Sequence, residues 1–208
     1  MPILQELMLF LKSKGNDDFI ESVVAYFGAP VTAGLKCACL VNISRCGQNI
    51  LGDWLNVRTK LSGRLSVDFA EMLVSERSVL LLIYRERELL RVLSMGGVQT
   101  FLAQFGYNGD LGSSAPYIAR LQERFSRIPR DSQGSQKMPH EVGVFLDYPL
   151  EDVKGFIENG GRNAKFAGYW KVYGNEIEAM RRFEAFRRAE TRSASLLLRK
   201  AQGLTEAA

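Results

Sequence analysis

The chain has 208 residues, 46% hydrophobic and 24% charged, with a formal net charge of +4. This composition is ordinary for a globular protein and excludes a largely disordered chain. The mild positive excess does not by itself indicate nucleic acid, because basic binders concentrate their charge on one face. No apolar run has the ~20 residues needed to cross a bilayer. The first residues also lack the basic region of a signal peptide, so we expect a cytoplasmic protein.

The first half of the chain predicts helices around two strands. Apolar residues over 3–28 fall at helical spacing. Residues 35–44 form a short apolar run, typical of a strand between two layers. A helix is expected over 51–61, and Asp68 to Val74 is predicted to be a short helix with the aspartate as its N-cap. Residues 78–85 are the clearest strand, because their continuous apolar residues indicate a central position, buried on both faces.

The second half alternates between helices and strands. Helical spacing is found over 86–94, 98–105 and 115–128. Residues 130–137 are polar and predict a loop. A strand over 141–147 is followed by a helix with Pro149 as its first residue. A strand over 166–173 and a long helix over 177–200 complete the chain.

These elements predict an α/β or α+β fold with one sheet of about four strands, mixed or parallel, covered by helices. The strands are expected near residues 36–43, 79–84, 141–146 and 166–172. We expect a single domain over 1–208, with a flexible loop at 130–137 and a disordered tail at 201–208.

Four stretches resemble the signatures of an uncharacterised bacterial family, classed as a domain of unknown function and found mainly in anaerobes. They are HEVGVFLDYPLEDV at 140–153, GYWKVYG at 168–174, APVTAGLK at 29–36 and the pair Tyr84-Arg85. The likeness spans about Phe19 to Arg188. Asp147 stands where glycine is expected, and Cys37 where proline is expected. The resemblance implies no activity, because none is established for the family.

His140 is the only histidine and precedes the predicted strand at 141. An imidazole there could act as a general acid or base near neutral pH, with Glu141 or Tyr148 assisting. The alternative is a structural role, in which His140 bonds a loop carbonyl and holds the start of the strand. A histidine pair on one helix face cannot form with one histidine, so that kind of metal site is excluded.

Three cysteines follow a C-x-C-x6-C spacing: Cys37, Cys39 and Cys46. In a strand the first two point to the same face, where they could bind a soft metal together with the third. Small buried core residues are the favoured interpretation, because free cysteine is among the most buried residue types. We therefore predict no metal site.

The stretch around Trp170 interleaves aromatic residues with a cation. In a strand, Tyr169, Lys171 and Tyr173 share one face, with Trp170 on the other. If Trp170 faces the core, the tyrosine and lysine face could bind an anionic or planar ligand by stacking and charge. Alternatively, it is an exposed sheet face of cross-strand pairs.

Lys36 and Arg85 lie near the ends of the first two predicted strands and are further candidates for ligand binding. Ligands of open parallel sheets collect beyond the carboxyl ends of the strands. Ser44, Arg85, Asp147, Tyr148 and Tyr173 occupy such ends. Structural salt bridges are a simpler account of the charges.

The leading hypothesis is therefore a cytoplasmic, non-enzymatic accessory protein that binds a small anionic molecule or a protein partner at the strand ends. The second is an enzyme that uses His140 as acid or base on a small anionic substrate. Nucleic-acid binding through the Arg-rich terminal helix is third, because glutamates interrupt its positive charge. No cofactor and no oligomeric state are indicated, and no membrane contact is expected.

Overall fold

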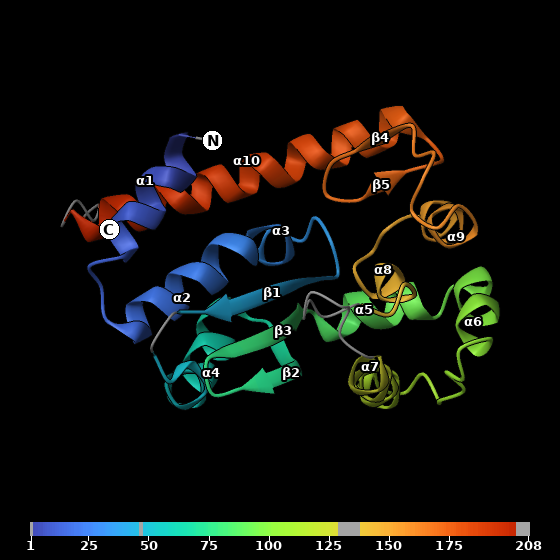
Figure 1. Ribbon diagram of the computed structural model, residues 1–208, viewed down its shortest axis with the longest axis horizontal. Coiled ribbons are helices and arrows are strands. Elements are labelled where there is room, and N and C mark those ends of the chain that lie inside the picture. The colour runs from blue at the N-terminus through green and yellow to red at the C-terminus, as the bar shows by residue number, and fades with distance from the viewer. Residues whose placement is uncertain (1, 46–47, 129–137, 203–208) are drawn as a thin grey trace.

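The computed structural model describes residues 2–45, 48–128 and 138–202. Figure 1 shows a small sheet flanked by helices, with one long helix lying along the molecule beside it. The predicted loop at 130–137 lies outside the described residues, as do residues 203–208 of the predicted tail. None of the described helices is both long and apolar enough to cross a membrane.

The chain mixes helices and strands throughout, as predicted. Its first half consists of α1 (Pro2–Leu11), α2 (Asn16–Phe27), α3 (Ala29–Thr32), β1 (Ala38–Ser44), α4 (Ile50–Leu65), β2 (Asp68–Ser75) and β3 (Ser78–Tyr84). Its second half consists of α5 (Glu86–Leu93), α6 (Gly96–Ala103), α7 (Ala115–Arg127), α8 (Val142–Phe145), α9 (Leu150–Glu158), β4 (Phe166–Ala167), β5 (Lys171–Val172) and α10 (Glu176–Ala201).

The main sheet has three strands in the order β1-β3-β2, and both pairings are antiparallel. The prediction that β3 is central is confirmed, and its residues Leu81, Leu82 and Ile83 are fully buried. The predicted four-stranded, mixed or parallel sheet is wrong. Strands β4 and β5 form a separate two-stranded hairpin.

The sheet separates two apolar cores. On one face Val41 and Leu81 pack with residues of α2 and α4, such as Val24 and Trp54. On the other face Leu82 packs with residues from α5 to α9. Because every second residue of β3 points to the same side, one continuous apolar strand supplies both cores.

Residues 68–74 are a strand and not the predicted helix. Strand β2 shifts register between Glu71 and Leu73, which is the mark of a β-bulge. The bulge adds one residue, so strict alternation is lost: Ala70, Met72 and Leu73 pack in one core while Phe69 packs in the other. The sequence pattern was therefore ambiguous at this point for a physical reason.

Residues 141–146 are the short helix α8 with its flanks, and not the predicted strand. Every residue from Glu141 to Leu146 is buried, so the segment shows neither a period of 2 nor one of 3.6. Gly143 lets α9 approach closely, because a Cβ there would lie 2.8 Å from Val153 Cγ2. The loss of this strand removes the parallel arrangement on which the strand-end argument depended.

The long helix α10 begins where the sequence predicts, and the Asn175 side chain accepts a hydrogen bond from the Glu178 amide at 3.1 Å. The helical spacing of Ile177, Met180 and Phe183 predicts that all three face inward. This prediction is wrong for Ile177 and Met180, which are 64% and 52% exposed, and is confirmed for Phe183, which is buried. The buried face of α10 therefore does not include Ile177 and Met180, near the start of the helix, and contains Phe183 further along.

Candidate functional site

Lys36 is a buried lysine, with 7% of its surface exposed, just before β1. Its Nζ lies 5.3 Å from the ring centroids of both Tyr148 and Phe186. Among the residues that the structure describes, none forms a hydrogen bond or an ion pair with this Nζ. A buried charge normally has a partner, so Lys36 departs from the rule.

The turn between α3 and β1 places Lys36 there. Gly34 takes φ +71°, a left-handed conformation that glycine adopts without strain, and the Leu35 amide donates to Pro30 O at 2.8 Å. The antiparallel register then brings Arg85 beside this turn, with its amide donating to Cys37 O at 3.0 Å. Lys36 thus leaves the turn on the side of α10, where Phe186 lies.

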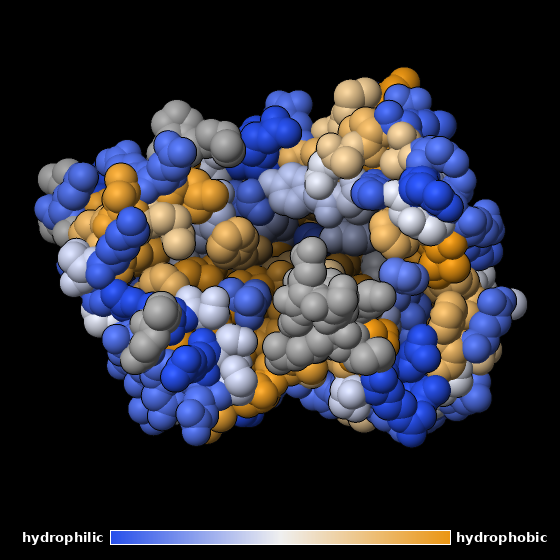
Figure 2. All heavy atoms as spheres, viewed as in Figure 1, coloured by the Kyte–Doolittle hydropathy of each residue, from blue (hydrophilic) through white to orange (hydrophobic). Residues whose placement is uncertain are grey.

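Lys36 lines a cavity of about 590 Å³ between β1, α10 and the hairpin loop, which we name the Lys36 cavity. Its polar and aromatic walls include Lys36, Tyr148, Tyr169, Phe186, Arg187 and Glu190. No fully enclosed side-chain nitrogen or oxygen among the described residues lacks a hydrogen-bond partner, so the amine must still reach open space. Figure 2 shows this face of the molecule hollowed between α10 and the sheet.

A tyrosine and a carboxyl group form another wall of the Lys36 cavity. The Tyr169 hydroxyl donates to Glu190 Oε2 at 2.6 Å. Burial raises the pKa of Glu190, although the Tyr169 hydrogen bond and the Lys36 charge oppose the shift. Glu190 therefore holds its proton more firmly than an exposed glutamate does, and its carboxyl is engaged by Tyr169.

The carboxylate of Asp147 is already engaged by Arg182. Arg182 Nη2 donates to Asp147 O at 2.7 Å and to Asp147 Oδ2 at 3.0 Å. The same guanidinium lies 5.7 Å from the Phe186 ring centroid, so Phe186 contacts both the Arg182 guanidinium and the Lys36 amine. Asp147 adopts φ 59°, which explains why glycine suits this position.

The surroundings of Lys36 favour its neutral form. Burial is the main cause that lowers the pKa of Lys36, and the Arg182 charge lowers it further. The thiols of Cys39 and Cys37 and the carboxylate of Asp147 act in the opposite direction but do not reverse the shift. A free amine on a cavity wall can accept a proton, a hydrogen bond or a new covalent bond.

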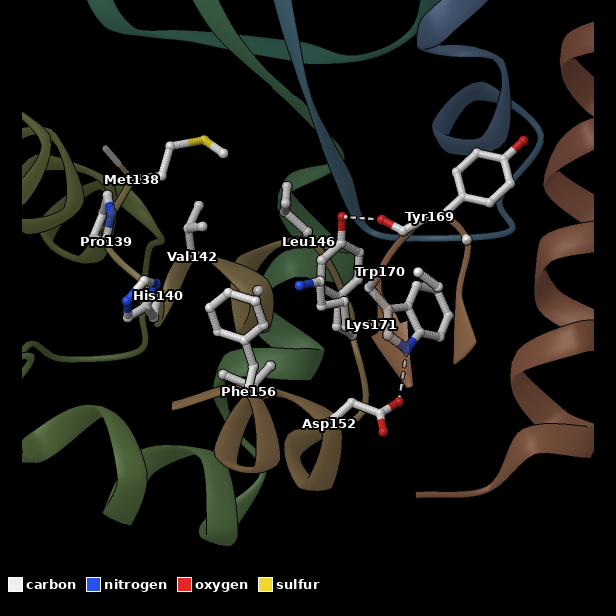
Figure 3. Close-up of a pocket in the computed structure, with 15 residues that line it drawn as sticks. Met138, Pro139, His140, Val142, Leu146, Asp152, Phe156, Tyr169, Trp170 and Lys171 are labelled. Carbon is white, nitrogen blue, oxygen red and sulfur yellow. Dashed lines mark hydrogen bonds between the residues drawn. The ribbon is translucent and has the colours of Figure 1, made fainter. Parts of the chain in front are cut away.

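A second cavity, of about 380 Å³, adjoins the first and shares Leu146, Tyr148 and Tyr169 with it. We name it the His140 cavity, and Figure 3 shows its lining. The Tyr148 hydroxyl donates to Tyr169 O at 3.2 Å, and burial raises the pKa of Tyr148 to about 12. Apart from His140, Asp152 and Lys171, its walls are mostly apolar or aromatic.

The structure places the three candidate residues for acid–base chemistry differently. His140 is exposed and lines its cavity, with its ring 5.1 Å from that of Phe156. Glu141 is buried, and its carboxylate accepts from Arg124 Nε at 2.6 Å and from the Tyr107 hydroxyl at 3.3 Å. Its oxygens are thus used by a structural ion pair rather than turned toward His140.

The candidate binding residues are also divided. Trp170 and Val172 are buried while Lys171 is exposed, as the strand alternation predicts. Lys171 Nζ lines the His140 cavity and donates to Gly161 O at 2.6 Å. Tyr173 lines neither cavity, and its hydroxyl donates to Arg162 O at 2.9 Å.

Arg85 also lies away from both cavities, and its Nη2 donates to Thr32 O at 3.2 Å. The argument from parallel strand ends is wrong, because antiparallel pairing puts Ser44 and Arg85 at opposite ends of the sheet. The structure brings predicted residues together at both cavities: Lys36, Tyr148 and Tyr169 line the Lys36 cavity, and the His140 cavity is lined by His140, Tyr148, Tyr169 and Lys171.

Cys37 and Cys39 are both buried. They do not share a face, because β1 begins at Ala38 and the two thiols enter different cores. Cys37 Sγ donates to Phe145 O at 3.3 Å and Cys39 Sγ to Phe27 O at 3.4 Å. Cys46 lies outside the described residues, and within them no group of three metal-ligating side chains comes together.

Sequence reasoning missed Phe186 and Glu190 as parts of the site. Both follow Phe183 at the i+3 and i+7 positions, so all three lie on one face of α10. A glutamate on the apolar face of a helix is the signal that could have identified this wall of the cavity.

In a comparison with protein families, the sequence matches a family described as "Protein of unknown function (DUF3793)", whose profile covers residues 24–205. Neither the curated proteins nor the solved structures contain a significant match. The matched region includes Lys36 and every other wall residue named for the Lys36 cavity. From this coverage, the chain belongs to this family of proteins of unknown function.

Proposed function

We propose that this protein binds a small anionic ligand with a flat apolar body in the Lys36 cavity. The observation that carries the proposal is the amine of Lys36, buried, facing the cavity and without an acidic partner among the described residues. Leaving a lysine in this position costs free energy, and a carboxylate from a ligand removes that cost.

The walls of the Lys36 cavity suit a flat ligand. Tyr148 and Phe186 lie against the lysine, and Tyr169 continues the aromatic lining. Aromatic rings favour stacked or edge-to-face contacts with planar groups. A volume of about 590 Å³ falls within the range of small-molecule sites, about 300–1,000 Å³.

Binding of an anion should bring a proton into the cavity. Because burial lowers the pKa of Lys36, the empty site holds the proton of this amine less firmly than water does. A carboxylate beside it favours the ammonium form and raises that pKa again. Ligand binding is therefore expected to be coupled to proton uptake, and to weaken as the pH rises.

Enzymatic use of His140 is a second hypothesis that the structure supports less directly. His140 lines a neighbouring cavity, but no carboxylate of the described residues bonds to its ring. A general base normally needs a group that orients it. For nucleic acid, the Arg188 side chain pairs with Glu184 and Arg182 with Asp147, which leaves α10 with less free positive charge.

The experiment compares two probes that differ in charge alone. Isothermal titration calorimetry measures binding of 2-naphthoate and of 2-naphthamide to the full chain and to Lys36→Met. A hydrogen bond to a charged group contributes about 1.5–3 kcal/mol, so naphthoate should lose about tenfold or more in affinity in the variant. The amide should bind both proteins equally.

Lys171→Met is the matched control, because Lys171 also lies over an aromatic ring, 5.8 Å from that of Phe156, but already has a hydrogen-bond acceptor. It should bind naphthoate like the unmodified chain. Equal naphthoate affinities for the unmodified chain and Lys36→Met would contradict the proposal.

A further inference from the structure

Lys36 has the surroundings that make a lysine amine nucleophilic. Its Nζ stands against two aromatic rings, makes no hydrogen bond to any described residue and reaches the open space of the cavity. An amine in an apolar site tends to be unprotonated, and its lone pair is then available to an electrophilic carbon. An exposed lysine is protonated and hydrated instead.

A second cation reinforces this state. Arg182 shares the Phe186 ring with Lys36 and is fixed there by two hydrogen bonds to Asp147. A neighbouring positive charge disfavours protonation of the amine, as in other reactive lysines. The Asp147 carboxylate is thus directed at the arginine rather than at the lysine.

We infer that Lys36 forms an imine with an aldehyde or ketone that has a flat apolar body and enters the Lys36 cavity. The inference rests on the proposed function, because it uses the same cavity and the same ligand shape. It adds a class of ligand, carbonyl compounds, and a covalent mode of capture.

The reaction balances without an oxidant or a reductant. The Nζ lone pair attacks the carbonyl carbon, and the π pair of the carbonyl moves to the oxygen, which takes up a proton. The nitrogen then loses a proton, the carbinolamine hydroxyl takes up a proton and leaves as water, and the resulting iminium loses its remaining N–H proton. The sum is one amine and one carbonyl compound giving one imine and one water.

The cavity contains a group suited to these proton transfers. Glu190 lines the same cavity and has a raised pKa, so its carboxyl can hold a proton nearer to neutral pH than usual. The Tyr169 hydroxyl fixes this carboxyl at 2.6 Å. Protonation of the departing hydroxyl is the step that a nearby acid assists.

The test uses 2-naphthaldehyde as the probe, with sodium cyanoborohydride to reduce any imine to a stable amine at pH 7. Peptide mapping by mass spectrometry then locates the label in the full chain. Lys36 should be labelled about tenfold or more faster than Lys171, because Lys171 is exposed and hydrogen-bonded. The rate should saturate with probe concentration and fall when 2-naphthoate is added.

Lys36→Arg should lose this label, while Lys171→Arg should keep it at Lys36. A second measurement does not depend on any variant folding. Labelling the unmodified chain in unfolding concentrations of urea should abolish the preference for Lys36, because the preference comes from the cavity.

Two failures are distinguishable. If label spreads over exposed lysines and spares Lys36 while naphthoate binding still needs Lys36, the imine inference is wrong and the proposed function stands. If naphthoate binding is also independent of Lys36, both are wrong.

Discussion

Two buried acidic residues and one buried lysine differ in how their polar groups are paired in the interior of this protein. Asp152 is 2% exposed, and its carboxylate accepts hydrogen bonds from Trp170 Nε1 and from the amides of Tyr173 and Gly174, each at 2.7 Å. Glu141 is 1% exposed and is paired with Arg124. Within the part of the chain that the structure describes, Lys36 has aromatic rings in place of such partners.

The difference separates structural charges from a candidate functional one. A fully satisfied buried carboxylate fixes the elements around it, as Asp152 fixes the β4-β5 hairpin to α9. A lysine whose side chain is buried and whose amine has no hydrogen-bond partner among the described residues fixes no other element, and its burial costs free energy. Because natural proteins commonly keep such costly groups at functional sites, Lys36 is the better marker of function.

The largest expected effect is at Asp152. Asp152→Ala should lower the free energy of unfolding by about 3–5 kcal/mol, because it leaves a buried indole and two amides without an acceptor. Asp152→Asn keeps one acceptor oxygen and should lose less. Urea unfolding followed by tryptophan fluorescence measures both, and a loss in Asp152→Ala below about 1 kcal/mol would mean that this carboxylate is not structural.

The opposite sign is expected at Lys36. Lys36→Met should raise the free energy of unfolding at pH 7 by about 1 kcal/mol, because an apolar chain of similar length replaces an amine without a partner. The same urea experiment measures it. A loss of 2 kcal/mol or more would show that Lys36 has a stabilising partner, and would contradict the difference drawn between Lys36 and the two buried acids.

The difference in the free energy of unfolding between Lys36→Met and the unmodified chain should depend on pH. Burial lowers the folded-state pKa of Lys36 below the ordinary 10.5, so between these two values the unfolded chain binds more protons than the folded one. The unmodified chain therefore becomes more stable as the pH rises through this window, and its deficit relative to Lys36→Met shrinks toward pH 10.5. The charged or titratable groups that act on Lys36 are Cys37, Cys39, Asp147, Arg182 and Glu190, and they are the same in both proteins. Unfolding curves at pH 7, 8 and 9 test the trend, and a deficit that grows with pH contradicts it.

The smallest effect is expected at Asp147. Asp147→Gly removes the strain of a non-glycine residue in the left-handed conformation, which should stabilise the fold by about 1 kcal/mol. It also removes a partly exposed ion pair with Arg182, which should destabilise the fold by up to about 1 kcal/mol. The two terms nearly cancel, so the stability should change by less than about 0.5 kcal/mol. If Asp147 were instead the counter-charge of Lys36, its removal would lower the stability clearly more than this.

Much of the fold could be predicted from local pattern. The continuous apolar run of β3 indicated a central strand, and Asn175 with Glu178 has the capping-box pattern typical of a helix start, where α10 begins. Two segments were assigned wrongly, because the bulge interrupts the alternation of β2 and because α8 is buried on all sides. These two wrong assignments led to the wrong prediction of the sheet.

The site was predicted only in part, and partly for the wrong reason. Lys36 was selected by a strand-end argument that requires a parallel sheet, whereas antiparallel pairing and the turn at Gly34 place it in its cavity. Its isolation from carboxylates depends on Arg182 taking up Asp147, a contact across 35 residues of chain. Such long-range competition leaves no trace in spacing or composition.

Proton uptake on ligand binding tests the central claim most directly. Calorimetric titration of 2-naphthoate at pH 8, in two buffers of different ionisation enthalpy, counts the protons that enter with the ligand. The account predicts net uptake in the unmodified chain and in Lys171→Met, and none in Lys36→Met. Binding of equal affinity without proton uptake in all three proteins would contradict it.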